Sequence, residues 1–159
     1  MEPALSHLTI DRDLALEFLA VFSRFEYALK VSNFRHPRNG EAKANWITFA
    51  NSVANAFNLN RTGELREAFA YLTRQPLRRF AVENNKLDWF PFSLPAVASE
   101  AERVIRLVRQ VRNNLFHGGK FARDPQSSPD HDSRLVRASL VLLRELLTLS
   151  PQVQKEYVD

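Results

Sequence analysis

Three side chains near the end of the chain, Arg112, Asn113 and His117, are of types that can handle protons and phosphate. They stand in the stretch RNNLFHGGK, residues 112–120. An imidazole exchanges protons near neutral pH because its unperturbed pKa is about 6.5. A guanidinium group binds phosphate through a planar fork and a permanent charge, and an amide can orient either group or bind phosphate itself. The stretch is therefore a candidate active site.

The same stretch also has an ordinary structural explanation. In a chain with 17 arginines and four histidines, chance alone supplies about 0.4 pairs with this spacing. A histidine at the C-terminus of a helix interacts favourably with the helix dipole, and glycines such as Gly118 and Gly119 commonly follow a helix end. On a continuous helix, His117 would lie about 140° around the axis from Arg112. If the helix stops at His117, the imidazole can turn elsewhere, and a two-fold related copy could supply the groups opposite it.

A strongly patterned helix positions these residues. It is predicted over about residues 98–116, because apolar residues at 104, 108, 111 and 115 are spaced four, three and four. Ser99 is expected to cap its N-terminus, and the two glycines are expected to end it. The remaining helices are predicted at about 11–33, 44–57, 62–73 and 133–149.

Composition narrows the class of protein. A chain of 159 residues, 45% of them apolar, fits one domain, here 1–159. The sequence contains no cysteine, which excludes disulfides, thiolate zinc sites and thiol catalysis and fits a cytoplasmic location. We expect no signal peptide and no membrane span, since neither pattern is present. The net charge of +4, carried mostly by arginine, is compatible with RNA or an acidic protein as partner.

The section 75–98 is the least regular part of the sequence. Pro76, Pro91 and Pro95 punctuate it, and LDWFPF, residues 87–92, is aromatic without a helical period. We expect one short helix and irregular chain here. LDWFPF would form either a patch that binds a partner or a segment that packs over the helical bundle.

Two segments of the chain resemble one known family. RNNLFHGG is similar to the R-N-x-x-x-H motif of the HEPN superfamily (higher eukaryotes and prokaryotes nucleotide-binding domains), and it likewise ends the penultimate long helix. FSRFEYALK, residues 22–30, resembles a first-helix stretch of several prokaryotic HEPN groups. The resemblance implies an all-α, up-and-down bundle of about five to six helices. It would contain a four-helix core, an irregular insertion near 75–98 and a homodimer built around the two motifs.

The resemblance also implies an activity. Many members of the superfamily are metal-independent RNases that act as toxins or in antiviral and stress defence, often beside a separate antitoxin or partner protein. Carried over, Arg112, Asn113 and His117 would be catalytic, with no cofactor and no metal. His117 would take the proton of the RNA 2′-OH while Arg112 stabilises the crowded phosphate, which leaves a 2′,3′-cyclic phosphate and a 5′-OH.

Two other interpretations of the motif stay open. Some HEPN proteins are non-catalytic modules that bind nucleic acid, nucleotide or a protein partner. An unrelated helical interaction domain could also carry the motif by accident. Genuine RNA cleavage that depends on His117 would separate the first interpretation from both alternatives.

Other residues are candidates for supporting roles. Glu26 would either hold the guanidinium of Arg112, as a polar residue does in several HEPN groups, or pair with Lys30 along its own helix. Lys120 would draw in the RNA backbone or be a solvated loop lysine, and Arg109 is predicted to bind RNA. His131 and its neighbouring aspartates lack the spacing of metal ligands and are expected at a helix N-terminus.

Overall fold

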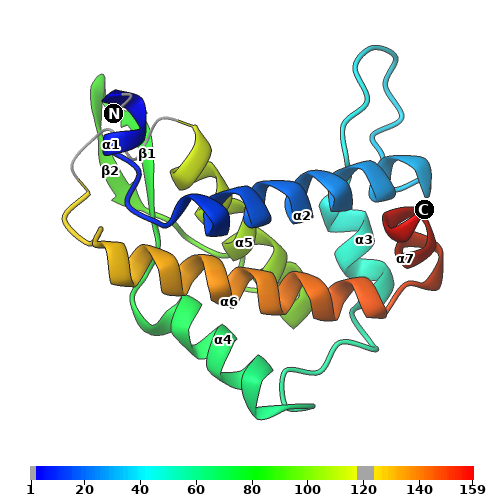
Figure 1. Ribbon diagram of the computed structural model, residues 1–159. Helices are drawn as coiled ribbons and strands as arrows, with labels where there is room; N and C mark the ends of the chain where they lie inside the picture. Colours follow the sequence, from blue (N-terminus) through cyan, green and yellow to red (C-terminus); the bar gives the residue numbers. More distant parts are fainter. Residues whose placement is uncertain (1–2, 118–123) are drawn as a thin grey trace.

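The computed structural model describes residues 3–117 and 124–159 and is mostly helical, with one small sheet (Figure 1). The elements, in chain order, are α1 (Pro3–Ser6), α2 (Arg12–Val31), α3 (Trp46–Val53), α4 (Gly63–Arg74), β1 (Arg78–Glu83), β2 (Lys86–Pro91), α5 (Glu100–Phe116), α6 (Pro129–Thr148) and α7 (Pro151–Val158). The predicted helical bundle is thus confirmed in its broad form, but the fold is not purely α-helical.

Helix starts follow from local capping chemistry. The Asp11 side chain accepts hydrogen bonds from the backbone N–H groups of Asp13 and Leu14 in the first turn of α2. The Ser99 hydroxyl caps α5 in the same way, with its Oγ 3.1 Å from the backbone N of Glu102. α6 begins earlier than predicted because Ser128 is its N-cap and a proline follows in the first turn. Asp130 and Asp132 also lie in that turn, which confirms their expected place at a helix N-terminus.

The last helix, α7, was missing from the sequence prediction. The preceding helix was predicted to end at about residue 149, and α6 does end at Thr148, shortly before Pro151. The same proline then opens α7, where its missing N–H costs nothing because the first turn lacks intrahelical partners. Ser150 caps this new helix through the backbone N–H of Val153.

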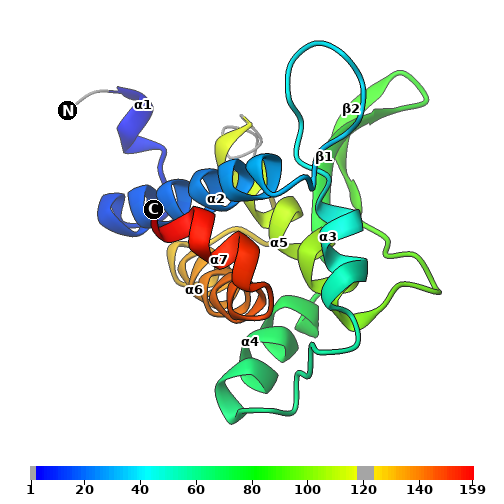
Figure 2. The ribbon, with the colours of Figure 1, turned by 90° about the vertical axis from the view of Figure 1, so that its right-hand side faces the viewer.

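The helices pack in layers around α6. α4 lies along one side of α6, and α2 lies along the other side together with α7 (Figure 1). α5 packs on α6 and α3, and its other side meets β1, so that α5 lies between α2 and the hairpin in the second view (Figure 2). The largest fully buried side chains are Phe18, Phe25, Phe49, Leu29, Leu72, Ile105, Leu142, Leu143 and Leu146.

Aromatic packing fixes α3 against α2. The Phe25 ring of α2 lies 5.1 Å from the Trp46 ring and 5.4 Å from the Phe49 ring, both of α3. Such pairs add about 0.5–1.5 kcal/mol each beyond the burial of their surface. The two phenylalanines of FSRFEYALK, Phe22 and Phe25, are therefore part of the hydrophobic core.

The prediction for residues 75–98 is wrong in its secondary structure. β1 and β2 form an antiparallel hairpin in which Phe80 pairs with Trp89 and Val82 with Leu87. Asn84 and Asn85 both have positive φ, 49° and 61°, which is the geometry of a type I′ turn that asparagine tolerates. The prolines of this section predicted irregular chain. Pro91, however, lies at the last position of β2, where a strand tolerates proline.

The aromatic segment LDWFPF packs over the bundle, as one of its two interpretations had it. Trp89 is only 4% exposed, and Phe92 packs against the hydrophobic core. Leu87 stands apart near the hairpin turn and is 60% exposed. None of the helices in the described ranges has the length and apolar character that a membrane crossing requires.

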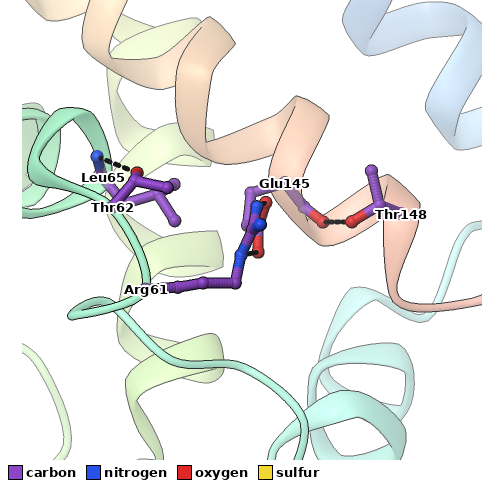
Figure 3. A network of polar contacts seen from close by, with 5 residues as sticks. All are labelled: Arg61, Thr62, Leu65, Glu145 and Thr148. Carbon is purple, nitrogen blue, oxygen red and sulfur yellow. Dashed lines mark hydrogen bonds and ion pairs between the residues drawn. The ribbon is translucent and has the colours of Figure 1, made fainter.

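An ion pair between an exposed arginine and a buried carboxylate ties the loop before α4 to α6 (Figure 3). Glu145 of α6 is 6% exposed, and both of its oxygens accept hydrogen bonds from Arg61, one of them at 2.7 Å from Nε. The contact raises the pKa of the Arg61 guanidinium above its ordinary value. The hydrogen bond to Glu145 is the larger cause, and the negative charge of Glu145 is the smaller one. Glu145 is thus a buried carboxylate whose charge is fully compensated.

Candidate active site at the C-terminal end of helix α5

The candidate site is exposed at the end of α5. Arg112 and Asn113 lie in the last turns of the helix, which ends at Phe116. His117 is the C-cap residue and has left the helical conformation, with φ −104° and ψ 31°. Asn113 and His117 are exposed, whereas Arg112 is half-buried. The helix end therefore presents the polar groups of the motif to solvent.

Arg112 and His117 meet within one chain. Nη1 of Arg112 contacts Nε2 of His117, and the same Nη1 lies 3.2 Å from the Asn113 Oδ1. We expected the two residues to diverge on a continuous helix. They converge because the backbone turns at His117 and because the long arginine side chain spans the remaining angle.

The contact determines the protonation pattern of the imidazole. A guanidinium group only donates hydrogen bonds, so Nε2 of His117 must be the acceptor. In a neutral ring, this contact places the proton on Nδ1. In this arrangement the basic lone pair of the imidazole is covered by Arg112.

The Arg112 guanidinium carries an uncompensated charge. Its Cζ lies 5.3 Å from the centroid of the Phe22 ring in α2, which supports it by a cation–π contact. Within residues 3–117 and 124–159, Nε is buried without a hydrogen-bond partner and no carboxylate forms an ion pair with Arg112. The positive charge is therefore positioned by an aromatic ring and left available to an anion.

Neighbouring arginines make this end of α5 electropositive. Although the Arg109 side chain is exposed, surrounding protein atoms lower its pKa from the ordinary value. Glu26 opposes this change, and the positive charges of Arg106 and Arg112 add to it. Arg109 and Arg112 thus lie close enough for their positive charges to act on each other.

Glu26 forms neither of the two ion pairs expected of it. In the described part of the chain, its side chain makes no ion pair with Arg112 or with Lys30. Its Oε1 instead lies 3.4 Å from the indole Nε1 of Trp46. The reason is geometric: the first turn of α3 lies against this part of α2, and the indole N–H needs an acceptor there.

A cleft opens beside His117. It has a volume of about 250 Å³ and is lined on one side by α5 and on the other by β1. Its lining residues are Arg79, Phe80, Ala81, Gln110, Asn113, Asn114 and His117. Sequence reasoning missed the β1 wall entirely. The available signal was RRFAVE followed by NN and KLDWF, two short runs around a turn that favours positive φ.

Asn114 joins the two walls of the cleft. Its Nδ2 donates to the backbone oxygen of Arg78 at 2.8 Å, and its Oδ1 accepts from the Gln110 Nε2 at 2.7 Å. Asn114 therefore has a structural role, because its side chain links α5 to the start of β1. The two neighbouring asparagines thus make different contacts. Asn113 contacts Arg112, whereas Asn114 holds the hairpin to the helix.

The remaining sequence candidates fall outside the site. Lys120 lies outside the described residues, as do Gly118 and Gly119. Nδ1 of His131 lies 2.8 Å from the Tyr71 hydroxyl, in a contact between α6 and α4. In the portions of the chain with defined placement, no three His, Asp or Glu side chains converge in a way that could hold a metal ion.

Comparison of the chain with protein-family models, with curated protein sequences and with solved structures found no match. The HEPN assignment consequently rests on the resemblance of two segments and stays a prediction. What the geometry adds is independent of that resemblance. It is an exposed arginine–histidine–asparagine cluster, electropositive and next to a cleft.

Proposed function

We propose that this protein is a metal-independent endoribonuclease that acts as a homodimer. One observation carries the proposal: the Arg112 guanidinium, with no carboxylate partner in the described part of the chain, contacts the imidazole of His117 on an exposed surface. A cation for phosphate and a base for a hydroxyl proton thus lie side by side. RNA supplies its own nucleophile, the 2′-OH, so these two functions are the ones cleavage needs.

The chemistry would begin with the release of His117. A phosphate group binds guanidinium through charge-assisted, often bidentate hydrogen bonds, which are stronger than a bond to a neutral imidazole. A scissile phosphate would therefore draw Arg112 away from Nε2 of His117. The freed Nε2 would then accept the 2′-OH proton.

Cleavage would replace one phosphorus–oxygen bond of the RNA backbone by another. The 2′-oxygen attacks phosphorus, the bond from phosphorus to the 5′-oxygen breaks, and the products are a 2′,3′-cyclic phosphate and a 5′-OH. Arg112 would stabilise the charge that builds on the equatorial oxygens, with Asn113 holding the guanidinium through its Oδ1. The departing 5′-oxygen also needs a proton, which a second imidazole can supply.

A homodimer would bring that second imidazole. α2 carries exposed apolar side chains along one side, with Leu16 64%, Leu19 41% and Tyr27 49% exposed. Their spacing places them on one face of the helix. Phe22, which supports Arg112, belongs to the same helix. A two-fold axis between this face and the end of α5 would bury the stripe and bring two copies of the site together.

Cleavage of single-stranded RNA tests the activity. Wild-type protein should cleave in the presence of a metal chelator and leave cyclic phosphate ends, whereas His117→Ala and Arg112→Ala should not. His36→Ala is the matched control, because His36 is exposed in the loop between α2 and α3, away from the site. Equal cleavage by wild type and His117→Ala, or cleavage by neither, would sink the nuclease proposal.

The dimer has its own test. Wild-type protein should sediment as a dimer, and Leu16→Glu combined with Leu19→Glu should give a folded monomer without activity. Both positions are exposed, so the substitutions spare the core. A wild-type monomer that cleaves RNA at the same concentration would contradict the shared site.

A toxin or defence role leads to a separate expectation. Induced expression of wild-type protein in bacteria should arrest growth, while His117→Ala expressed to the same level should not. Growth arrest by both variants would point to a cause other than RNA cleavage. In that case, rescue of growth by a co-expressed antitoxin would say nothing about the Arg112–His117 site.

A further inference from the structure

We propose that the cleft beside His117 is a nucleobase subsite, in which the Phe80 ring stacks on a base of single-stranded RNA. The inference rests on the proposed function, since it places a base of the substrate next to the site of cleavage. It adds a role for the β1–β2 hairpin, which the catalytic cluster does not use. The subsite would contribute affinity and set which base lies beside the scissile phosphate.

Phe80 is unusual among the aromatic residues of the described chain. It is 36% exposed and is the only phenylalanine among the exposed large hydrophobic residues in the described ranges. Its ring lies 5.3 Å from that of Trp89, which is 4% exposed and supports it from the hairpin. An aromatic ring with a rigid support and an open side is a stacking platform for any base.

Polar groups on the opposite wall can contact the edge of a stacked base. The Gln110 Nε2 donates hydrogen bonds to the Asn114 Oδ1 and to the backbone oxygen of Arg78. The Asn113 Oδ1 accepts a hydrogen bond from Arg112. Within residues 3–117 and 124–159, no hydrogen bond engages the Gln110 Oε1 or the Asn113 Nδ2. One acceptor and one donor therefore remain on side chains that line the cleft. They can pair with a donor and an acceptor on the edge of a base.

The size and place of the cleft fit a single base. Its volume of about 250 Å³ lies below the range of about 300–1,000 Å³ typical of pockets that enclose a whole drug-sized ligand. His117 and Asn113 line the same cleft. A nucleotide whose base enters the cleft would hold its ribose and phosphate toward the Arg112–His117 cluster.

The hairpin also offers a matched control. Leu87 is 60% exposed on β2 and is not among the residues that line the cleft. It pairs with Val82 rather than with Phe80. Removing its side chain should change the apolar surface of the hairpin without touching the subsite.

Binding of a short single-stranded 2′-fluoro RNA, which lacks the nucleophilic hydroxyl, tests the subsite without cleavage. Phe80→Leu should weaken binding about ten-fold, because an aliphatic side chain cannot stack. Phe80→Tyr should keep the affinity within about two-fold, since its ring is retained. Leu87→Ala should bind like wild type. Ultraviolet cross-linking followed by mass spectrometry should attach the RNA to the peptide that contains Phe80.

The outcomes separate this inference from the proposed function. Unchanged binding by Phe80→Leu, with cross-links elsewhere, overturns the subsite even if wild-type protein cleaves RNA. Phe80-dependent binding by a protein that cleaves no RNA overturns the nuclease proposal and supports the subsite. Absence of binding by folded wild-type protein overturns the subsite, while the cleavage assay still decides the nuclease proposal. Circular dichroism of each variant confirms that the fold is intact.

Discussion

Arg61 and Arg112 are both arginines in contact with another side chain, yet their surroundings differ. Arg61 compensates the buried carboxylate of Glu145 through two hydrogen bonds. Arg112 contacts an imidazole and an amide, and its guanidinium lies over the Phe22 ring. The first pair neutralises two charges and holds α6 to the loop before α4. The second leaves a positive charge available at the surface.

The difference shows how one residue type serves stability or chemistry. A guanidinium that faces a carboxylate has no remaining charge to offer a ligand, and removing it leaves a buried anion unpaired. A guanidinium held by an aromatic ring keeps its charge and most of its donors. Substitutions at the two positions should therefore move different measurements.

The largest effect is expected at the α5 cluster. His117→Ala should reduce RNA cleavage by about 10²–10⁴-fold, because a positioned general base contributes about that factor. The melting temperature should stay close to that of wild type, since His117 is an exposed C-cap residue. Arg61→Ala should leave the cleavage rate unchanged in the same assay. Loss of cleavage by Arg61→Ala in a folded protein would erase the distinction between the two regions.

Arg61→Ala should instead lower the melting temperature, by on the order of 5 °C, because Glu145 would be left buried without its partner. Adding Glu145→Gln should recover part of the loss, since a neutral amide is easier to bury than a charge. Thermal unfolding followed by circular dichroism measures both steps. If the double variant is less stable than Arg61→Ala alone, the buried carboxylate is not the source of the effect.

Glu26→Gln should have a smaller effect. Glu26 contacts Trp46 rather than Arg112, and glutamine keeps a hydrogen-bond acceptor for the indole. We expect cleavage to change by less than about three-fold. A loss comparable to that of Arg112→Ala would show that the carboxylate does hold the motif arginine during the reaction.

The subtlest prediction concerns one proton. In ¹⁵N spectra of labelled histidine, His117 at neutral charge should carry its proton on Nδ1, because Nε2 accepts from Arg112. Arg112→Ala should release this preference and allow the Nε2–H form. Identical tautomer populations in both proteins would mean that the contact does not persist in solution.

Much of the fold was accessible from local sequence signals. Apolar spacing and capping residues such as Asp11 and Ser99 predicted the long helices, because both signals act within a few residues. The β-hairpin and α7 were missed for a related reason. Prolines at 91 and 151 suggested interruption, whereas each occupies a terminal position where a strand or helix accepts it.

The sequence by itself determined the identity of the motif residues and their place at a helix end. Tertiary structure alone decided what surrounds them. The Phe22 support for Arg112, the Trp46 partner of Glu26 and the β1 wall of the cleft join segments that lie far apart in the chain. Periodicity reports which face of a helix is buried, but contacts between distant segments depend on how whole elements pack.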